Sequence, residues 1–560
     1  MAFTPLLSAA RPVPSETTTV NSPTPEPGTL HSRKRRPWWV GSPLLLVIAL
    51  FILPLAGSPP ATNPNEVVRI ELAASIAFWA RFDLGSTDEV YGQSEDVSIR
   101  DGQVYSDKAP GLSMIAAPVV SIVNPILERA PSSDLPAYWP LRHTLTLLLV
   151  ALPTVGLAFL VVAAVPAANP QQRSAYALIA ALTTPLWAYG TMFFGHASAA
   201  LLVTLAWFLL LGFPGRSTSL SPRRAALGGA VAGLAVTTEY PTVLLVAVIF
   251  VTLLVRRTVL PVLAGAAAGA LIGVLPALVY HQVAFGAPWI TGYSFKAASD
   301  FQAIIAHGFF GISWPSLEAL WGVLFSARRG LLFFSPILLL APIGLWRMAR
   351  RRGFRDVAPL TAAITVYVLF ASGFVDWEAG WCAAARHLVP IVPLLAIPLV
   401  FALMNVGTGR WWNSLVAVLI AFSGVNAVLC IALTPFFPPQ FTSPLAQLVL
   451  PSLIEGAGLD SIVSATIGLP PTYVVIAIIA ATIAALGWAS SLVLRLPKRW
   501  VAAVFATAIA AQFLWLSWQG TSPSPEVEFM RAQVLRRLGH TAVAAQIEES
   551  LISAATYARD

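Results

Sequence analysis

Residues 96–118, DVSIRDGQVYSDKAPGLSMIAAP, are the stretch from which the architecture of this chain can be read. The stretch follows the first hydrophobic block, contains Asp96, Asp101, Asp107 and Lys108, and then becomes an apolar, helix-like segment. Charged residues make up only 11% of the 560-residue chain, so they are scarce elsewhere. A group of charges directly before an apolar segment predicts a site at a membrane surface.

The rest of the chain is strongly apolar. Hydrophobic residues make up 57% of it, and its mean hydropathy is +0.74, whereas soluble domains are about half apolar and about a quarter charged. The apolar residues form long blocks, and roughly 20 residues of helix cross a bilayer core. No alternating ten-residue pattern indicates a β-barrel. We therefore expect an all-α, polytopic membrane protein.

The hydrophobic blocks predict about thirteen transmembrane helices, at 42–61, 141–166, 175–193, 197–214, 224–240, 241–256, 259–280, 330–347, 357–375, 388–404, 412–434, 472–495 and 500–518. Basic residues mark cytoplasmic connections, and here they cluster at 33–36, 216–224, 256–257, 347–355, 410 and 495–499. This distribution predicts an N-terminus inside and a C-terminus outside. It also explains the net charge of +8 without a nucleic-acid partner.

The segment 109–127 is apolar enough to span, but a crossing there would put the later basic loops outside. Pro110, Pro118 and Pro125 also suit a broken segment better than a clean span. We therefore expect a helix that lies in the outer interface or enters it shallowly. The large loops are then all outside, at 62–140, 281–329, 435–471 and 519–560.

The domain organisation follows from these blocks. Residues 1–38 are rich in Pro, Ser and Thr and predict a disordered, basic cytoplasmic tail. Residues 39–518 form the expected transmembrane domain, and 519–560 form an extracytoplasmic helical tail. The only two cysteines, Cys382 and Cys430, form no disulfide framework or metal set. A single bridge between them and two unpaired thiols both stay open.

Three segments and one arginine carry a resemblance to a known family. NEVVRIELAASI (65–76) resembles the helix that begins the family's first outer loop with an acidic residue. DGQVYSDKAPGLSMIAAP (101–118) resembles the family's Gly-x-x-Tyr-x-x-Lys-x-Pro segment. DWEAGWCAAARHLVPIVPLL (376–395) resembles a later segment of the family, and Arg142 resembles the arginine on its phosphate side. Together they resemble the GT-C fold integral-membrane glycosyltransferases across most of 42–404. The likeness is to bacterial aminoarabinose and lipopolysaccharide-sugar transferases and, more distantly, to protein O-mannosyltransferases.

The resemblance implies transfer of a sugar from a polyprenyl-phosphate donor to an acceptor hydroxyl of a glycan, glycolipid or protein. The reaction would take place at the outer face of a bacterial plasma membrane, among membrane lipids and with inversion. It needs a carboxylate to accept the acceptor's proton and cations to stabilise the departing phosphate. No cofactor is implied. A divalent metal would take carboxylate ligands, but no metal-ligand set stands out, and metal-independent transfer is expected.

Two carboxylates lead as the catalytic base. Asp96 resembles an Asp upstream of the Tyr-Ser-x-Lys run in relatives, and Glu66 matches the family's acidic start. Asp101 precedes a glycine and is expected to form a tight turn. Asp107 is next to Lys108 and is expected to pair with it at the substrate site. For each of them, the competing interpretation is a solvated loop carboxylate.

The phosphate side is expected to include Lys108, Arg142 and Arg386, because cations stabilise phosphate and a guanidinium binds it with two parallel hydrogen bonds. The competing interpretations are an exposed lysine and an arginine that anchors a helix end at the membrane surface. The resemblance adds Tyr105, from the Tyr-x-x-Lys pattern. His387 is also a candidate, against a helix-capping or core histidine.

Four ionisable residues near membrane edges remain. Arg328 and Arg329 precede a span, and one of them is a candidate to face phosphate. Glu239 and His196 lie at the ends of spans, where an ionisable group is a functional candidate but also an ordinary feature of a membrane edge. The aromatic residues of the outer loops favour an interfacial belt, with sugar stacking as the alternative; they are Trp289, Tyr293, Trp314, Trp377 and Trp381.

Two other functions stay open. A transporter or flippase for a lipid-linked sugar would place charges and helix breaks in mid-span and show paired halves, whereas the polar residues here gather in the outer loops. A catalytically inactive scaffold is the other alternative, because Asn65 stands where relatives often have an acidic residue before Glu66.

Overall fold

The computed structural model describes residues 50, 63–85, 94–127, 138–164, 169–212, 219–404, 406–407, 409–461, 464, 467–520 and 523–557. The predicted N-terminal tail and, apart from Leu50, the first predicted span lie outside the described residues. The elements are, in chain order, α2 (Pro64–Trp79), β1 (Val97–Arg100), β2 (Gln103–Ser106), α4 (Gly111–Leu127), α5 (Tyr138–Thr146), η1 (Leu147–Ala151), α6 (Leu152–Ala163), α7 (Pro170–Leu182), α8 (Leu186–Tyr189), α9 (Gly195–Leu210), α10 (Pro222–Thr238), η2 (Tyr240–Thr242), α11 (Val243–Val255), α12 (Leu260–Phe285), η3 (Gly292–Phe295), α13 (Ser299–Ile305), α14 (Leu317–Phe325), α15 (Leu331–Phe334), η4 (Pro336–Leu340), α16 (Ala341–Arg352), α17 (Phe354–Ser372), η5 (Arg386–Ile391), α18 (Val392–Met404), α19 (Arg410–Ala432), η6 (Leu445–Val449), α20 (Leu450–Ile454), α22 (Pro471–Val493), α23 (Lys498–Gln519), α24 (Pro525–Arg537) and α25 (Thr541–Tyr557).

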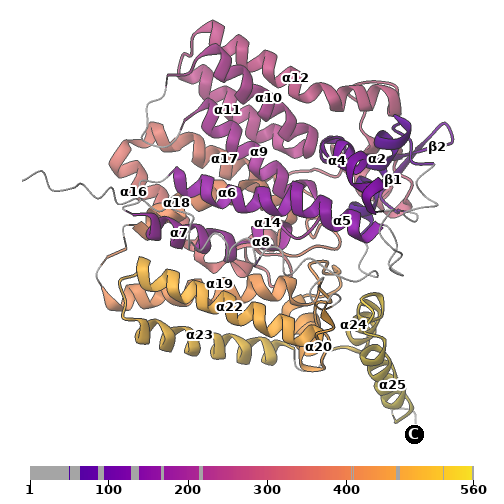
Figure 1. Ribbon diagram of the computed structural model, residues 1–560, viewed down its shortest axis with the longest axis vertical. Helices are drawn as coiled ribbons and strands as arrows, with labels where there is room; N and C mark the ends of the chain where they lie inside the picture. The colour runs from indigo at the N-terminus through magenta and orange to yellow at the C-terminus, as the bar shows by residue number, and fades with distance from the viewer. Residues whose placement is uncertain are drawn as a thin grey trace, which may run out of the picture. The chain divides into compact units, whose positions relative to one another are not determined.

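Long helices run side by side through this part of the chain (Figure 1). In the described residues, seven helices are long and apolar enough to cross a membrane: Pro140–Ala163, Leu260–Phe285, Phe354–Ser372, Arg386–Met404, Arg410–Ala432, Pro471–Val493 and Lys498–Gln519. Shorter apolar helices, such as Gly195–Leu210 and Tyr240–Val255, cover other predicted spans. The protein is thus a helical, multi-pass membrane protein, while the count of thirteen spans and the sidedness stay predictions.

The helices α10 and α12 pack backbone against backbone. A Cβ placed on Gly269 of α12 would lie 2.0 Å from the carbonyl oxygen of Ala226, and one on Gly229 would meet α12 equally closely. Small residues spaced in this way let membrane helices approach each other. The contact is reinforced because Thr237 Oγ1 donates a hydrogen bond of 2.9 Å to the Gly273 oxygen. This contact fixes the position of the loop that follows α10.

One β-hairpin interrupts the helical architecture. Strands β1 and β2 are antiparallel, with Arg100 opposite Gln103. The two residues between them, Asp101 and Gly102, have φ of 51° and 77°. Two residues of positive φ form the tight turn that joins hairpin strands, which confirms Asp101 as a turn residue. The described fold is therefore helical with one small β-hairpin between α2 and α4, whereas the sequence predicted an all-α fold.

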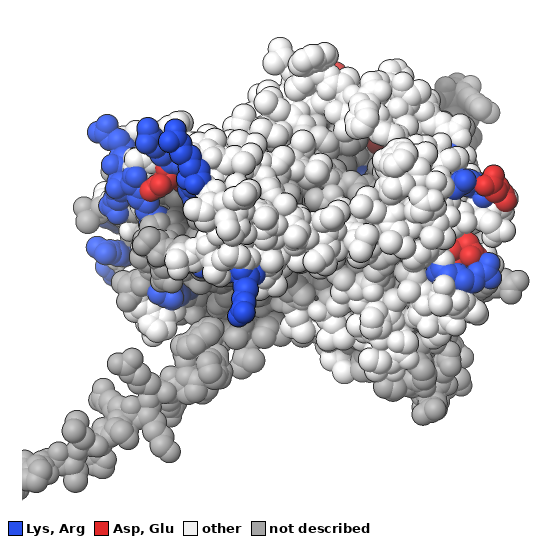
Figure 2. All heavy atoms as spheres, turned by 90° about the horizontal axis from the view of Figure 1, so that it is seen from above, with Lys and Arg blue, Asp and Glu red and all other residues white. Residues whose placement is uncertain are grey.

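Charges lie at the two ends of the bundle. On the face seen in Figure 2, Lys and Arg gather at one end and a few charged residues lie at the opposite end, with a broad uncharged band between them. The first end is where α10 and α12 begin and α16 ends; the hairpin and α2 lie at the other (Figure 1). A band free of charge between two charged ends is the pattern of a membrane-spanning bundle.

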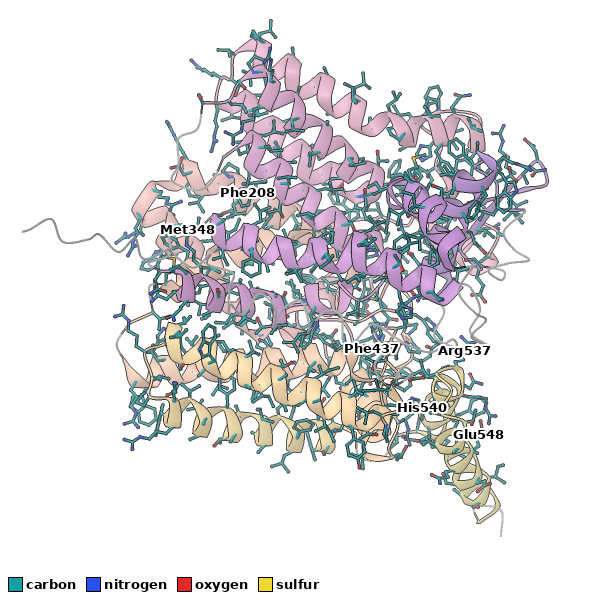
Figure 3. All side chains as sticks on the ribbon, in the orientation of Figure 1. Phe208, Met348, Phe437, Arg537, His540 and Glu548 are labelled. Atoms are coloured by element: carbon teal, nitrogen blue, oxygen red, sulfur yellow. The ribbon has the colours of Figure 1, made fainter. Side chains whose placement is uncertain are left out.

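The two C-terminal helices, α24 and α25, meet at Gly539, whose φ is +84°. Arg531 of α24 binds Glu455 through both guanidinium nitrogens, at 2.5 and 3.0 Å. His540 Nε2 lies 2.9 Å from the Gly458 oxygen, and the Arg537 guanidinium lies 5.2 Å from the ring centre of Trp381. Figure 3 shows Arg537 and His540 on this helical pair. The pair therefore packs against residues of the loops that precede η5 and follow α20.

Candidate functional site

Two carboxylates and two lysines form one group at the base of the hairpin. Lys108 Nζ lies 3.0 Å from Asp96 Oδ1 and 3.1 Å from Asp107 Oδ1. Lys296 Nζ lies 2.8 Å from Asp107 Oδ2 and 3.8 Å from Asp96 Oδ1. The exposed fractions of the four side chains are at most 14%. We call these four residues the charge group.

The strand β1 and the loop after α12 hold the charge group together. Ser98 Oγ donates a 2.6 Å hydrogen bond to the Gly292 oxygen, and the Ala297 amide donates one of 3.1 Å to the Val97 oxygen. A Cβ on Gly292 would lie only 2.8 Å from the Cα of Asp107. The loop thus runs directly beside the strand, and this contact brings Lys296 to the two aspartates.

Opposite charges stabilise the charged forms of Asp96 and Lys108, whereas burial and the nearby Lys108 lower the pKa of Lys296. Burial raises the pKa of Asp96, but the ammonium groups of Lys108 and Lys296 outweigh it and hold this pKa below its usual range. Burial lowers the pKa of Lys108, but Asp107 and Asp96 outweigh it and raise this pKa. Asp96 is therefore ionised at neutral pH. Among the described residues its Oδ1 has both lysine partners and its Oδ2 has none.

Arg386 faces the same site with its guanidinium unpaired. No hydrogen bond or ion pair joins it to any described residue, and its charge acts on both Asp96 and Lys108. Its neighbour His387 stacks on Phe374, with ring centres 4.6 Å apart and planes 1° apart. The structure thus offers Arg386 to a ligand and packs His387 as a ring.

Glu239, at the end of α10, carries a second cluster. Arg69 Nη2 binds Glu239 Oε1 at 2.9 Å, and Arg69 also donates to the Asn65 side chain and to the Ala109 oxygen. His196 Nδ1 lies 3.4 Å from the same Glu239 oxygen. Arg69 thereby ties α2 to the start of α4 and to the loop after α10.

Glu66 and Arg142 form a separate, fully buried ion pair. Arg142 Nε and Nη2 donate to the two Glu66 oxygens at 2.9 and 2.8 Å, and the Phe193 amide donates to Glu66 at 2.6 Å. Burial raises the pKa of Glu66, although Arg142 and the Phe193 amide lower it. Tyr105 also lies apart from the charge group, with its ring edge against Phe285 at 5.7 Å.

Arg329 is used by the backbone of a neighbouring loop. It is fully buried, and its guanidinium donates to four backbone oxygens, those of Arg328, Glu378, Gly380 and Phe437. Arg328 pairs with Glu378. The loop that leads to Arg386 thus solvates the Arg329 charge, and the expectation that one of these two arginines contacts phosphate stays a prediction.

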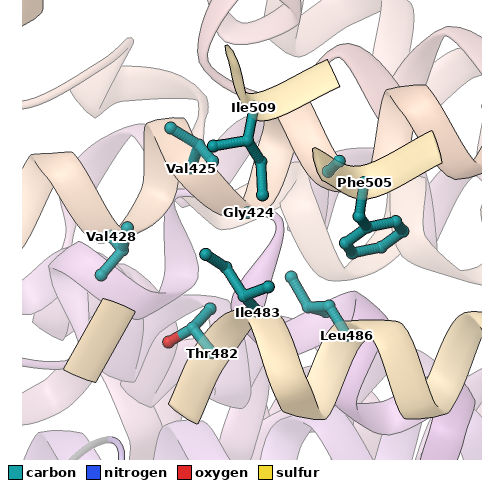
Figure 4. Close-up of a pocket in the computed structure, with 9 residues that line it drawn as sticks. Gly424, Val425, Val428, Thr482, Ile483, Leu486, Phe505 and Ile509 are labelled. Carbon is teal, nitrogen blue, oxygen red and sulfur yellow. The ribbon is translucent and has the colours of Figure 1, made fainter. Parts of the chain in front are cut away.

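Neither a metal cluster nor the apolar pocket coincides with the charge group. In the described part of the chain, no three His, Cys, Asp or Glu side chains are placed to hold a metal ion. The pocket in Figure 4 lies between α19, α22 and α23 and is lined mainly by aliphatic side chains such as Val425, Ile483 and Leu486. Cys382 and Cys430 are both buried and unbridged.

Two residues of the site escaped the sequence analysis. Lys296 pairs with residues about 190 positions earlier, which periodicity does not reveal. It is, however, the only charged residue between Arg257 and Asp300, and this isolation is a usable signal. Arg69 sits in the predicted first-loop helix, where a basic residue on an otherwise apolar face could have been noticed.

Comparison with known proteins gives a likeness of fold. No protein-family model and no curated protein matches the sequence. Among solved structures, ArnT from Cupriavidus metallidurans bound to undecaprenyl phosphate is 17% identical, over 88% of this chain and 78% of that chain, with a TM-score of 0.47. The Archaeoglobus fulgidus oligosaccharyltransferase is 12% identical, over 70% and 56%, with a TM-score of 0.35. At such low sequence identities and TM-scores the likeness gives no information on substrate or mechanism. Both are therefore argued below from the side chains of this protein.

Proposed function

We propose that this protein is a membrane glycosyltransferase that moves a sugar from a polyprenyl-phosphate donor to an acceptor hydroxyl at the outer membrane face. The observation that carries the proposal is the charge group beside the unpaired guanidinium of Arg386. It combines an ionised carboxylate with a free oxygen and three cations at the same end of the bundle as the first outer loop. The ArnT structure holds a lipid of the proposed donor class.

In the proposed reaction Asp96 acts as the base. Its free Oδ2 accepts the proton of the acceptor hydroxyl, and the acceptor oxygen attacks the anomeric carbon of the sugar. A new carbon–oxygen bond forms on one face while the bond to the phosphate oxygen breaks on the other. The products are the glycosylated acceptor, with inverted configuration, and polyprenyl phosphate. Asp96 suits this role better than Glu66, because both oxygens of Glu66 are bonded to Arg142.

The cations stabilise the departing phosphate. Arg386 offers parallel N–H donors, and Lys108 and Lys296 can exchange a carboxylate partner for a phosphate oxygen. Negative charge that develops on the leaving oxygen is stabilised most strongly by fixed cations in a site shielded from water. A flippase has no need of a free carboxylate beside these cations, and the charge group lies at the base of the hairpin, at the end of the bundle where α2 also lies (Figure 1).

The test is transfer by the purified protein in lipid nanodiscs from a panel of polyprenyl phosphate sugars. Asp96→Asn should lower kcat by about 10²- to 10⁴-fold without weakening the binding of sugar-free polyprenyl phosphate, because the substitution frees Lys108 and Lys296 of one carboxylate partner. Asp101→Asn is the matched control, because that carboxylate lies exposed at the hairpin tip, and Glu66→Gln tests the other candidate base. Full activity of Asp96→Asn would overturn the assignment, and failure of the wild type to bind polyprenyl phosphate would overturn the function.

A further inference from the structure

We propose that Glu239 binds a hydroxyl group of the transferred sugar and thereby excludes uronic acids as donors. This inference rests on the proposed function and assigns the part of the site that reads the sugar. Three observations carry it: a carboxylate oxygen without a partner, a rigid holder for that carboxylate, and its position within the electrostatic reach of the proposed phosphate-binding cations.

The first observation concerns the partners of the two oxygens of the Glu239 carboxylate. Oε1 of Glu239 accepts a 2.9 Å hydrogen bond from Arg69, and His196 Nδ1 lies 3.4 Å from it without a hydrogen bond. Within the described residues Oε2 has neither a hydrogen bond nor an ion pair, although only 13% of the side chain is exposed. A carboxylate oxygen that no protein group uses is available to accept a hydrogen bond from a ligand hydroxyl.

The second observation is how firmly Glu239 is held. The residue ends α10 in an extended conformation, and Thr242 donates to its carbonyl oxygen through both its amide and its hydroxyl. A Cβ on Gly195 would lie 2.5 Å from Oε1, so only glycine leaves room for the carboxylate at the start of α9. With Arg69 on the other side, the carboxylate has little freedom to turn. A fixed carboxylate can select among hydroxyl positions on a sugar ring.

The third observation is that Glu239 and the charge group share neighbours. The charges of Lys108 and Arg386 act on Glu239 as they act on Asp96. The ring of Tyr293 lies edge-on to that of Tyr240, the residue after Glu239, with ring centres 6.3 Å apart. These aromatic rings offer a sugar an apolar surface in addition to the carboxylate that accepts hydrogen bonds from its hydroxyls.

The preference for one class of sugar follows from the negative charge of the Glu239 carboxylate. A carboxylate oxygen accepts hydrogen bonds strongly from hydroxyl groups, and it repels a second carboxylate brought close to it in a shielded site. A neutral sugar can therefore lie with its phosphate on Arg386 and Lys108 and a hydroxyl on Glu239. A uronic acid that placed its carboxylate at the same position would lose the hydrogen bond and meet like charge.

The experiment measures binding, so that it does not depend on turnover. Lipids compete with a fluorescent short-chain polyprenyl phosphate for the protein in nanodiscs. The competitors are sugar-free polyprenyl phosphate and the same lipid carrying mannose, galactose, arabinose or glucuronic acid. We expect at least one neutral sugar to raise affinity over the sugar-free lipid, and glucuronic acid not to do so.

Glu239→Gln should reduce the gain in affinity from the neutral sugar by about 10- to 100-fold while the affinity for sugar-free lipid changes less than twofold. Glu318→Gln, on an exposed position of α14, is the matched control and should change neither. His196→Gln, which changes the side chain 3.4 Å from the carboxylate, should give a smaller loss in the same direction and serves if Glu239→Gln does not fold.

Two results would overturn the inference: an unchanged neutral-sugar gain in both variants, or a wild type that prefers the glucuronic acid lipid. Failure of the proposed function looks different, because the wild type would then not bind sugar-free polyprenyl phosphate at all. Lys108→Ala, which weakens the cation side and leaves Glu239 in place, should weaken every lipid in the panel by a similar factor.

Discussion

Arg142 and Glu66 bind each other through two hydrogen bonds across 76 residues of chain, and both side chains are buried. The family resemblance implies a separate role for each, a phosphate ligand and a base. In the structure each is the other's partner, and the pair joins α2 to α5. Those two roles stay predictions, while the pair itself has consequences for stability that can be measured.

Breaking this pair from one side should be worse than removing it. Glu66→Gln or Arg142→Met alone leaves an uncompensated buried group, which costs about 3–5 kcal/mol. The double variant should be more stable than the sum of the two losses predicts. The measurement is a double-mutant cycle of apparent unfolding free energy in detergent. Additive losses would show that the two side chains do not depend on each other.

The acidic limit of activity should depend on Lys296. Asp96 must be ionised to accept a proton, and the ammonium groups of Lys108 and Lys296, which hold its pKa below the usual range, keep it ionised at neutral and mildly acidic pH. Lys296→Gln removes one of the cations that lower this pKa, while Lys108 and Arg386 remain. The acidic limb of kcat/KM should therefore move up by about one pH unit. Lys498→Gln, at the opposite end of the bundle, should leave the profile unchanged; an unmoved limb in both variants would remove Asp96 from the proton transfer.

Arg386 should contribute to lipid affinity without stabilising the empty protein. It has no partner among the described residues, so Arg386→Gln leaves no group unpaired. Hydrogen bonds to charged groups are worth about 1.5–3 kcal/mol, and we expect polyprenyl phosphate to bind about 10- to 100-fold more weakly. Arg410→Gln is the control, since its guanidinium lies over the Trp500 ring, 3.6 Å from its centre. Unchanged affinity in Arg386→Gln would contradict the proposed phosphate site.

Arg329 should position Arg386 indirectly. Its donors hold the oxygens of Glu378 and Gly380 in the loop that ends at Arg386. Arg329→Lys keeps the charge but cannot hold all of these acceptors, because an ammonium lacks the planar fork of donors. We expect about a tenfold weaker affinity for polyprenyl phosphate, a lower melting temperature, and an unchanged acidic limb. A kcat equal to that of the wild type, measured with saturating lipid, would distinguish a positioning effect on binding from loss of the base.

The sequence predicts what depends on local pattern and misses what depends on tertiary contact. Apolar blocks locate the long helices because burial in lipid requires about 20 apolar residues in a row, and the Asp101–Gly102 pair predicts its turn from backbone preference alone. Lys108 was expected near Asp107 because the two are adjacent. The arrival of Lys296 depends on the close fit of Gly292 against Asp107, which no periodicity encodes.

The same limit explains two contacts that the sequence does not reveal. Glu239 looked like an ordinary residue at a membrane edge, because Arg69, which binds it, lies 170 positions away in the chain. Arg329 looked like a free cation because its acceptors are backbone oxygens, and backbone oxygens carry no signature in a sequence. In both cases the partner, rather than the residue, decides the role.

The charge group has a further consequence for how the protein behaves at rest. Its two aspartates and two lysines cancel, so the empty site presents little net field beyond that of Arg386 to small anions in solution. A phosphate that arrives alone must displace a carboxylate from a lysine and gains little by doing so, whereas a lipid held by its tail can stay until the exchange is complete. Internal neutrality thus acts as a filter, reserving the site for anions delivered from within the membrane.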